Sequence, residues 1–239
     1  MIHGKRKAVT FSYDDGVEQD IRLIGLFDKY GLKGTFNLNS GMFGVKGDDI
    51  RKGAYIRADR LKKEDIRSVY ENHEVAAHTL THPNLTRLSD QEIIRQVEKD
   101  RISLSELTGR EVTGMAYPGG GINYNTRVAQ IIRKYTGVQY ARTTVVTNSF
   151  SRQKNLYEFK PNVYHVMNMD RLFTMGEKFL SSQAEEDQIF YVWGHSFEFD
   201  INDTWGRFEE FLKMISGYED IFYGTNSEVF LEKEERCQG

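Results

Sequence analysis

The chain has 239 residues, of which 39% are hydrophobic and 28% are charged, and it contains only three prolines. This composition is typical of a globular protein and excludes a disordered or fibrous chain. The net charge of −3 gives no electrostatic reason to expect nucleic-acid binding, and the single cysteine, Cys237, cannot form an internal disulfide.

Apolar runs with strand character alternate with segments of helical period along the whole chain. Strands are predicted at 7–13, 35–39, 74–77, 112–117, 138–142, 189–193 and 220–223, with an extended piece at 162–166. Helices are predicted at 18–30, 61–71, 90–107, 126–135, 170–180, 204–215 and 227–235, and the glycine-rich segment 41–59 is expected to be an irregular loop. The alternation predicts one domain over residues 1–239, an α/β fold with a largely parallel sheet, open or closed into a barrel.

Local signals mark the ends of two of these helices. Ser89 and Glu92 have the spacing of a capping box, and Gly109 follows the same helix at its far end. Gly31 has the same position after the first helix. These signals fix the predicted helix boundaries more firmly than hydrophobic period alone.

No apolar stretch approaches the roughly 18 residues needed to cross a bilayer. The first residues, MIHGKRKAVTF, contain no apolar signal core ahead of the first predicted strand. We therefore expect a cytoplasmic protein without a membrane span, although a chain from which a leader had been removed would read the same way.

Polar residues follow the predicted strands at their carboxyl ends, where parallel sheets bind ligands. The residues in these positions are Asp14 and Asp15, His78, Tyr117 and Pro118, and His195. The sequence therefore gathers its candidate reactive groups at one end of the predicted sheet.

Two carboxylates and two histidines suggest a metal site. Adjacent charges such as Asp14 and Asp15 repel each other, so this pair is either a solvated turn or lies beside positive charge. His78 and His82, in HTLTH, are four residues apart, so on a helical turn both imidazoles would face the same way and share one metal. Two imidazoles and one carboxylate form a typical catalytic zinc shell. A capping histidine beside a surface histidine is the alternative.

Two further stretches suit hydrolysis. His195 follows a hydrophobic strand and a glycine, a position that suits a general acid at the rim of a pocket, or a histidine at the edge of the core. The run AYPGGG, residues 116–121, offers backbone N–H groups that can approach a ligand closely, or a flexible connection between strand and helix.

In this order, the motifs FSYDDG, HTLTHPNL, AYPGG and WGHS resemble the polysaccharide deacetylase family, also called carbohydrate esterase family 4 or the NodB homology domain. The resemblance implies a distorted (β/α) barrel of about seven strands. It also implies removal of N- or O-linked acetyl groups from a saccharide, such as one containing N-acetylglucosamine. One divalent metal is implied, most often zinc, with cobalt, manganese or nickel as other choices.

The resemblance also assigns roles to residues. Asp14 corresponds to the catalytic base and His195 to the general acid, while Asp15, His78 and His82 correspond to the metal ligands. Tyr117, Pro118 and Gly119 occupy the positions of the segment that binds the substrate and the oxyanion.

The sequence departs from the family pattern at four places. Ala116 stands where the third motif has an arginine that pairs with the catalytic aspartate, Tyr117 replaces the proline after it, and Gly119 stands where a tyrosine is common. The fourth motif, Asp-x-x-Asp-Trp, which orients the acid histidine, is absent. We expect Arg142, which ends another predicted strand, to supply the missing positive charge beside Asp14.

These departures keep two other functions open. Some relatives hydrolyse a non-peptide C–N bond in small amides on the same scaffold. A non-catalytic carbohydrate-binding protein is the second alternative. The oligomeric state is left open by the sequence.

Overall fold

The computed structural model of the chain describes residues 1–51, 54–165, 169–201 and 203–231. Its main sheet contains the strands β1 (Lys7–Asp14), β2 (Gly34–Leu38), β5 (Glu74–Ala77), β6 (Gly114–Ala116), β7 (Tyr140–Arg142), β8 (Val163–Tyr164), β9 (Gln188–Gly194) and β10 (Ile221–Tyr223). Seven of them pair in the order β7-β6-β5-β2-β1-β9-β8, and β10 pairs with the first residues of β1. All these pairs are parallel.

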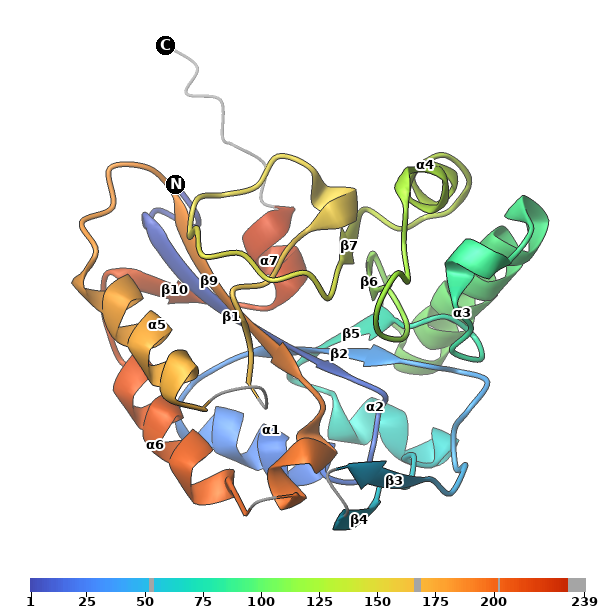
Figure 1. The fold of residues 1–239 in the computed structure, drawn as a ribbon, viewed down its shortest axis with the longest axis horizontal. Coiled ribbons are helices and arrows are strands. Elements are labelled where there is room, and N and C mark those ends of the chain that lie inside the picture. Colours follow the sequence, from blue (N-terminus) through green and yellow to red (C-terminus); the bar gives the residue numbers. More distant parts are fainter. Residues whose placement is uncertain (52–53, 166–168, 202, 232–239) are drawn as a thin grey trace.

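The helices lie around the outside of this curled sheet, with α5 and α6 at the left of Figure 1 and α3 at the right. They are α1 (Asp20–Lys29), α2 (Ile66–Val69), α3 (Asp90–Thr108), α4 (Thr126–Tyr135), α5 (Met169–Ser181), α6 (Trp205–Ile215) and α7 (Asn226–Phe230). The short 3-10 turns are η1 (Lys63–Asp65), η2 (Leu85–Arg87), η3 (Leu156–Glu158) and η4 (Ser196–Asp200). None of the described helices combines the length and the apolar composition needed to span a membrane.

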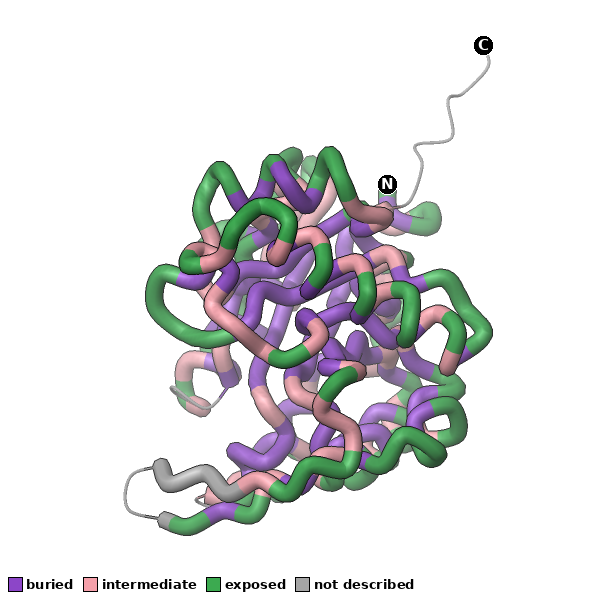
Figure 2. Tube along the Cα trace, turned by 90° about the vertical axis from the view of Figure 1, so that its right-hand side faces the viewer, coloured by how far each residue is buried: buried purple, intermediate pink, exposed green. Residues whose placement is uncertain are grey.

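The architecture is a distorted (β/α) barrel that remains open between its edge strands β7 and β8, so the predicted fold class is confirmed. All eight residues of β1 are buried, as expected for a strand covered on both faces. Figure 2 shows buried residues concentrated in the interior of the molecule and exposed residues on its outer segments. Because the strands of the main sheet are all parallel, their carboxyl ends meet at one end of the barrel.

Two predicted segments were wrong in detail. The segment 41–59 is not simply irregular, because β3 (Asp48–Arg51) and β4 (Ala54–Arg57) form an antiparallel hairpin within it. The helix predicted at 61–71 is reduced to η1 and the single turn of α2. The last predicted helix, 227–235, corresponds to α7, and its end lies with Cys237 outside the described residues.

Candidate active site

Asp14 and Asp15 follow one another at the carboxyl end of β1 but point to different partners. Asp14 is the last residue of the strand, whereas Asp15 has a φ of 89°, in the left-handed region that L-residues rarely adopt. Gly16 continues the turn with a φ of 66°. Left-handed backbone costs an L-residue roughly 1–2 kcal/mol. The backbone turn at Asp15 is therefore formed at an energetic cost.

Asp14 is buried and paired with a cation. Arg142 Nη2 lies 2.6 Å from Asp14 Oδ1 and also contacts Oδ2, and both side chains are almost fully buried. Asn37 Nδ2 donates a second hydrogen bond of 2.8 Å to Oδ1. The structure thus brings Arg142, from β7, to the carboxylate that the sequence analysis expected it to reach.

The HTLTH segment is a loop, so the predicted helical turn was wrong. Thr79 and His82 have φ values of 69° and 58°, and these two left-handed residues fold the loop so that the rings of His78 and His82 lie 4.9 Å apart. Asn39 Nδ2 donates to the carbonyls of His78 and Thr79. Gln96 accepts the N–H of Thr81 through its side chain, so α3 also holds the loop.

Asp15, His78 and His82 form a cluster whose ligand atoms all lie within 4.8 Å of one another. Apart from its ion pair with Arg60, Asp15 Oδ1 has no hydrogen-bond partner, and it lies 3.9 Å from His78 Nε2 and 3.7 Å from His82 Nε2. One carboxylate oxygen and two imidazole nitrogens thus converge on a small space, and these are the donor types that bind divalent metals. The donor set therefore fits a divalent metal ion.

The protonation of His78 also suits a metal ligand. Its Nδ1 lies 2.9 Å from the carbonyl oxygen of Ala116, so Nδ1–H donates there and Nε2 keeps a lone pair facing Asp15. Burial lowers the pKa of His78 to about 4, against the opposing charge of Asp14. The imidazole is therefore neutral at pH 7, as metal binding requires.

Arg60 is a second cation at this site, and the sequence analysis did not find it. Its Nη1 lies 3.0 Å from Asp15 Oδ1 and also contacts the carbonyl oxygen of Asp15. Burial alone would raise the pKa of Asp15, but Arg60 and the neighbouring histidines hold it well below its usual range. Asp15 is therefore ionised, as a metal ligand must be.

His195 contacts the cluster at Asp15. It follows the last residue of β9, and its Nε2 lies 3.8 Å from Asp15 Oδ2. Burial opposes the charged imidazolium, but Glu198 and the two aspartates raise the pKa of His195 to about 9. His195 is therefore protonated, and its Nε2 faces Asp15.

These groups share one pocket of about 350 Å³. It is lined by Asp14, Asp15, His78, His82, Gly119, Gly120, Gly121, Thr144, Tyr164, Trp193 and His195. Tyr117, expected near the substrate, is directed elsewhere, because its hydroxyl donates to the carbonyl of Tyr157 and its N–H to that of Arg142. Pro118 is buried beside it. Of the three residues expected to contact the substrate, Gly119 alone lines the pocket.

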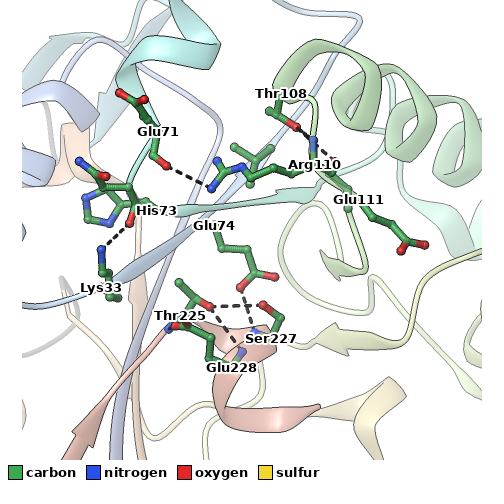
Figure 3. A pocket seen from close by; sticks show the side chains of 13 residues that line it. Lys33, Glu71, His73, Glu74, Thr108, Arg110, Glu111, Thr225, Ser227 and Glu228 are labelled. Carbon is green, nitrogen blue, oxygen red and sulfur yellow. Dashed lines mark hydrogen bonds between the residues drawn. The ribbon is translucent and has the colours of Figure 1, made fainter. Parts of the chain in front are cut away.

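A larger pocket, of about 410 Å³, opens at the amino ends of β2 and β5. Figure 3 shows its charged side chains: Arg110 donates to the carbonyl of Glu71, and Glu74 accepts from the N–H of Ser227. Lys33 likewise donates to a backbone carbonyl, that of Asn72. Lys33 and Arg110 in this pocket thus already have hydrogen-bond acceptors within the protein. The cluster of Asp15, His78 and His82, the group of candidate metal ligands found among the described residues, lies in the smaller pocket.

Three residues that contact the candidate site groups were not predicted from the sequence: Arg60, Asn37 and Glu198. Arg60 follows a segment treated as an irregular loop, so no pattern pointed to it. Asn37 occupies an inner position of β2, one strand from Asp14. Glu198 had a usable signal, because a residue three positions after His195 lies beside it in any helical turn.

The family of the chain follows from comparison with known proteins. The profile of the polysaccharide deacetylase family matches residues 2–141. Among curated proteins, peptidoglycan-N-acetylglucosamine deacetylase PgdA of Listeria monocytogenes is 27% identical over 119 residues, which is 49% of this chain and 22% of that protein. The chain thus spans about a fifth of the length of this relative.

Solved structures show the same fold at low identity. A putative polysaccharide deacetylase from Mycobacterium smegmatis aligns with a TM-score of 0.68 and 15% identity, over 95% of this chain and 90% of that one. A family 4 carbohydrate esterase pseudoenzyme from Bacillus anthracis aligns with a TM-score of 0.55 and 19% identity, over 94% of this chain and 66% of that one. With a family profile that covers more than half of the sequence, the chain belongs to the polysaccharide deacetylase family.

Proposed function

We propose that the chain is a metal-dependent hydrolase that removes N- or O-linked acetyl groups from a saccharide, such as an oligosaccharide containing N-acetylglucosamine. The observation that carries this proposal is the shared pocket, in which Asp14 lies beside His78 and His195 lies beside Asp15 of the cluster of Asp15, His78 and His82. A metal site flanked by a basic and an acidic group is what hydrolysis of an acetyl bond requires.

In this proposal Asp15, His78 and His82 hold one divalent ion. A bound ion acidifies water and polarises a carbonyl oxygen, which is the chemistry that the protein groups alone do not provide. Zinc suits two neutral imidazoles and one carboxylate, and cobalt, manganese or nickel also accept such a mixed nitrogen and oxygen set.

Asp14 is proposed to accept the proton of the attacking water. Arg142 and Asn37 both donate to its carboxylate, which fixes the orientation of the group, and Asp14 Oδ2 lies 3.9 Å from His78 Nε2 at the metal site. The base is therefore held at the pocket wall where the water would lie. The acetyl carbon gains the water oxygen, and the bond to the sugar nitrogen or oxygen then breaks.

His195 is proposed to give a proton to the departing sugar amine or hydroxyl. Its Nε2 faces the cluster from the other side of Asp15. An amine leaves as a neutral molecule only when it is protonated, so an acid in this position is needed most for N-acetyl substrates. The backbone N–H of Gly119, at the pocket edge, is proposed to donate to the developing oxyanion.

We also propose that residues 1–239 form one catalytic domain, because β1 and β10 pair in the same sheet and thereby join the two ends of the described chain. The name of the Listeria relative supports N-acetylglucosamine as part of the substrate.

Two alternatives are retained. The replacement of the motif arginine by Ala116 favours a small amide with a non-peptide C–N bond over a polysaccharide. The structural likeness to a Bacillus anthracis pseudoenzyme raises a non-catalytic carbohydrate-binding role. The buried ion pair of Asp14 with Arg142 argues against a non-catalytic role, because it preserves the cation beside the proposed base.

A substrate panel tests the proposal. The zinc-loaded protein is incubated with N-acetylated chitooligosaccharides, O-acetylated xylooligosaccharides and small linear and cyclic amides, and acetate and free amine are quantified. Acetate release from the saccharides supports deacetylation, amine release from the small amides alone supports the C–N hydrolase, and saccharide binding without turnover supports the non-catalytic relative.

A further inference from the structure

Glu198 lies directly behind His195. The two residues are three positions apart, at the start of η4, and Glu198 Oε1 is 3.3 Å from His195 Nδ1. The Glu198 side chain is fully buried. With Nδ1 turned toward Glu198, the opposite ring nitrogen, Nε2, faces Asp15 and the pocket.

A buried carboxylate is costly unless several donors compensate it. Glu198 Oε2 accepts from the backbone N–H of His195 at 3.1 Å and lies 3.1 Å from His165 Nε2. The hydroxyl of Tyr164 donates to Oε1. These groups come from η4 and from β8 and its end, so the carboxylate is held from two directions.

His165 supports this carboxylate from inside the core. It is fully buried, and its Nδ1 lies 3.1 Å from the hydroxyl of Tyr13. A consistent arrangement of protons follows: the tyrosine hydroxyl donates to Nδ1, and Nε2–H donates to Glu198. Gly194 permits this approach, because a Cβ at that position would lie 2.4 Å from His165 Nε2.

We propose that Glu198 is the positioning residue for His195, and that His165 and Tyr13 hold Glu198 in place. The proposal rests on the deacetylase function proposed above. Glu198 fixes the imidazole so that Nδ1–H donates to the carboxylate and Nε2 delivers the proton to the leaving group. The carboxylate comes from the turn that follows His195 itself, where the sequence lacks the separate Asp-x-x-Asp-Trp motif.

A merely structural role for Glu198 is the competing explanation, because its Oε2 caps the first turn of η4. The cap uses one carboxylate oxygen, whereas the other oxygen contacts the imidazole of His195 and the hydroxyl of Tyr164. A test must therefore separate loss of the cap from loss of proton delivery.

The zinc-loaded full chain and its Glu198→Gln variant are compared on two substrates. An N-acetylated chitooligosaccharide has an amine leaving group that needs a proton, whereas 4-nitrophenyl acetate has a leaving group that departs without one. We expect kcat on the oligosaccharide to fall by ~10²–10⁴-fold with little change in KM, and kcat on the aryl ester to fall by less than ~10-fold. An equal fall on both substrates, or no fall on either, contradicts the proposal.

Glu74→Gln is the control, since Glu74 is a partly buried glutamate that accepts three hydrogen bonds at the other end of the barrel. It should leave the ratio of the two kcat values unchanged. If Glu198→Gln does not fold, Tyr164→Phe removes one donor to Glu198 and keeps the ring stacked on Trp193. It should lower the same ratio by a smaller factor, and an unchanged ratio counts against the proposal.

A readout without substrate separates this inference from the proposed function. NMR of selectively ¹⁵N-labelled, zinc-loaded protein should show a slowly exchanging Nδ1–H proton on His195 that disappears in Glu198→Gln. If the wild type releases no acetate but this signal behaves as expected, the function fails and the positioning role stands. If the wild type is active and the signal persists in the variant, the positioning role fails alone.

Discussion

Arg142 and Asp14 form a buried ion pair between the ends of two strands that are not neighbours in the sheet. The arginine ends β7, and its Nη2 contacts both carboxylate oxygens of Asp14 at the end of β1. Ala116 lies beside Arg142 in the register of β6 and β7. The cation thus comes from the same level of the barrel, one strand away from the position where the family pattern has its arginine.

Loss of this cation should impair turnover more than metal binding. We expect Arg142→Lys to lower kcat by about 10–100-fold, because lysine keeps a charge but loses the planar fork that contacts both oxygens. Zinc content, measured by elemental analysis, should be unchanged. Arg101→Lys is the control, since Arg101 forms a partly buried ion pair with Glu98 on α3, and Arg101 does not line the pocket. Equal activity of Arg142→Lys and wild type would contradict the role given to the ion pair.

Substitution of Asp14 and of Asp15 should have different effects on acetate release and on zinc binding. Asp14→Asn keeps the shape of the side chain but removes the proton acceptor, so acetate release should fall by at least ~10²-fold while zinc remains bound. Asp15→Asn should instead lose zinc, because the ligand charge disappears. Elemental analysis and acetate release are measured on both variants. Loss of zinc from Asp14→Asn would reverse the division of roles.

The metal ligands can be tested without any substrate. His78→Gln should weaken zinc binding by more than the ~10–100-fold that loss of an outer partner costs, as measured by competition with a chromophoric chelator. His73→Gln is the matched control, since His73 is equally buried but lies in the pocket at the opposite end of the barrel. The same zinc affinity in both variants would exclude His78 as a ligand.

The free energy of unfolding should fall as the pH rises, because of the buried carboxyl group of Asp20. This carboxyl is fully buried and accepts from Tyr70 and Ser196, and burial raises its pKa to about 7. Above pH ~4 the unfolded chain releases the proton while the folded protein keeps it, so the free energy of unfolding falls until the pH passes about 7.

We expect Asp20→Asn to flatten this fall, which amounts to at most ~4 kcal/mol, in urea unfolding of the metal-free protein from pH 4 to 8. Asp170→Asn changes an exposed carboxyl and serves as the control. An identical pH dependence in wild type and Asp20→Asn would show that the raised pKa is not that of Asp20.

Much of the fold was predictable because local signals and hydrophobic period agreed. Ser89 does cap α3 by accepting the N–H of Glu92, and Gly109 ends the helix with a φ of 71°. The pairing of β3 with β4 was missed because each strand has only four residues and the surrounding segment is rich in glycine. Whether the sheet stays open or closes into a barrel depends on long-range packing between its edge strands. No local sequence signal could therefore decide between the two.

The grouping of Asp15, His78 and His82 was predicted from residue types, but its local structure was not. His78 and His82 were expected on a helical turn, whereas two left-handed residues bring them together. Sequence spacing cannot reveal such backbone, because side chains from elsewhere in the fold hold it. Arg60 could not be predicted either, because it contacts Asp15, a residue 45 positions away in the sequence.

The most direct measurement is acetate release from an N-acetylated chitooligosaccharide by the same protein preparation before and after metal removal. The chelator-treated protein should release no acetate. Addition of up to one equivalent of zinc should restore acetate release in proportion to the fraction of protein molecules whose site at Asp15, His78 and His82 is occupied. Acetate release that survives complete removal of the metal, or no release from fully zinc-loaded and folded protein, would contradict metal-dependent deacetylation.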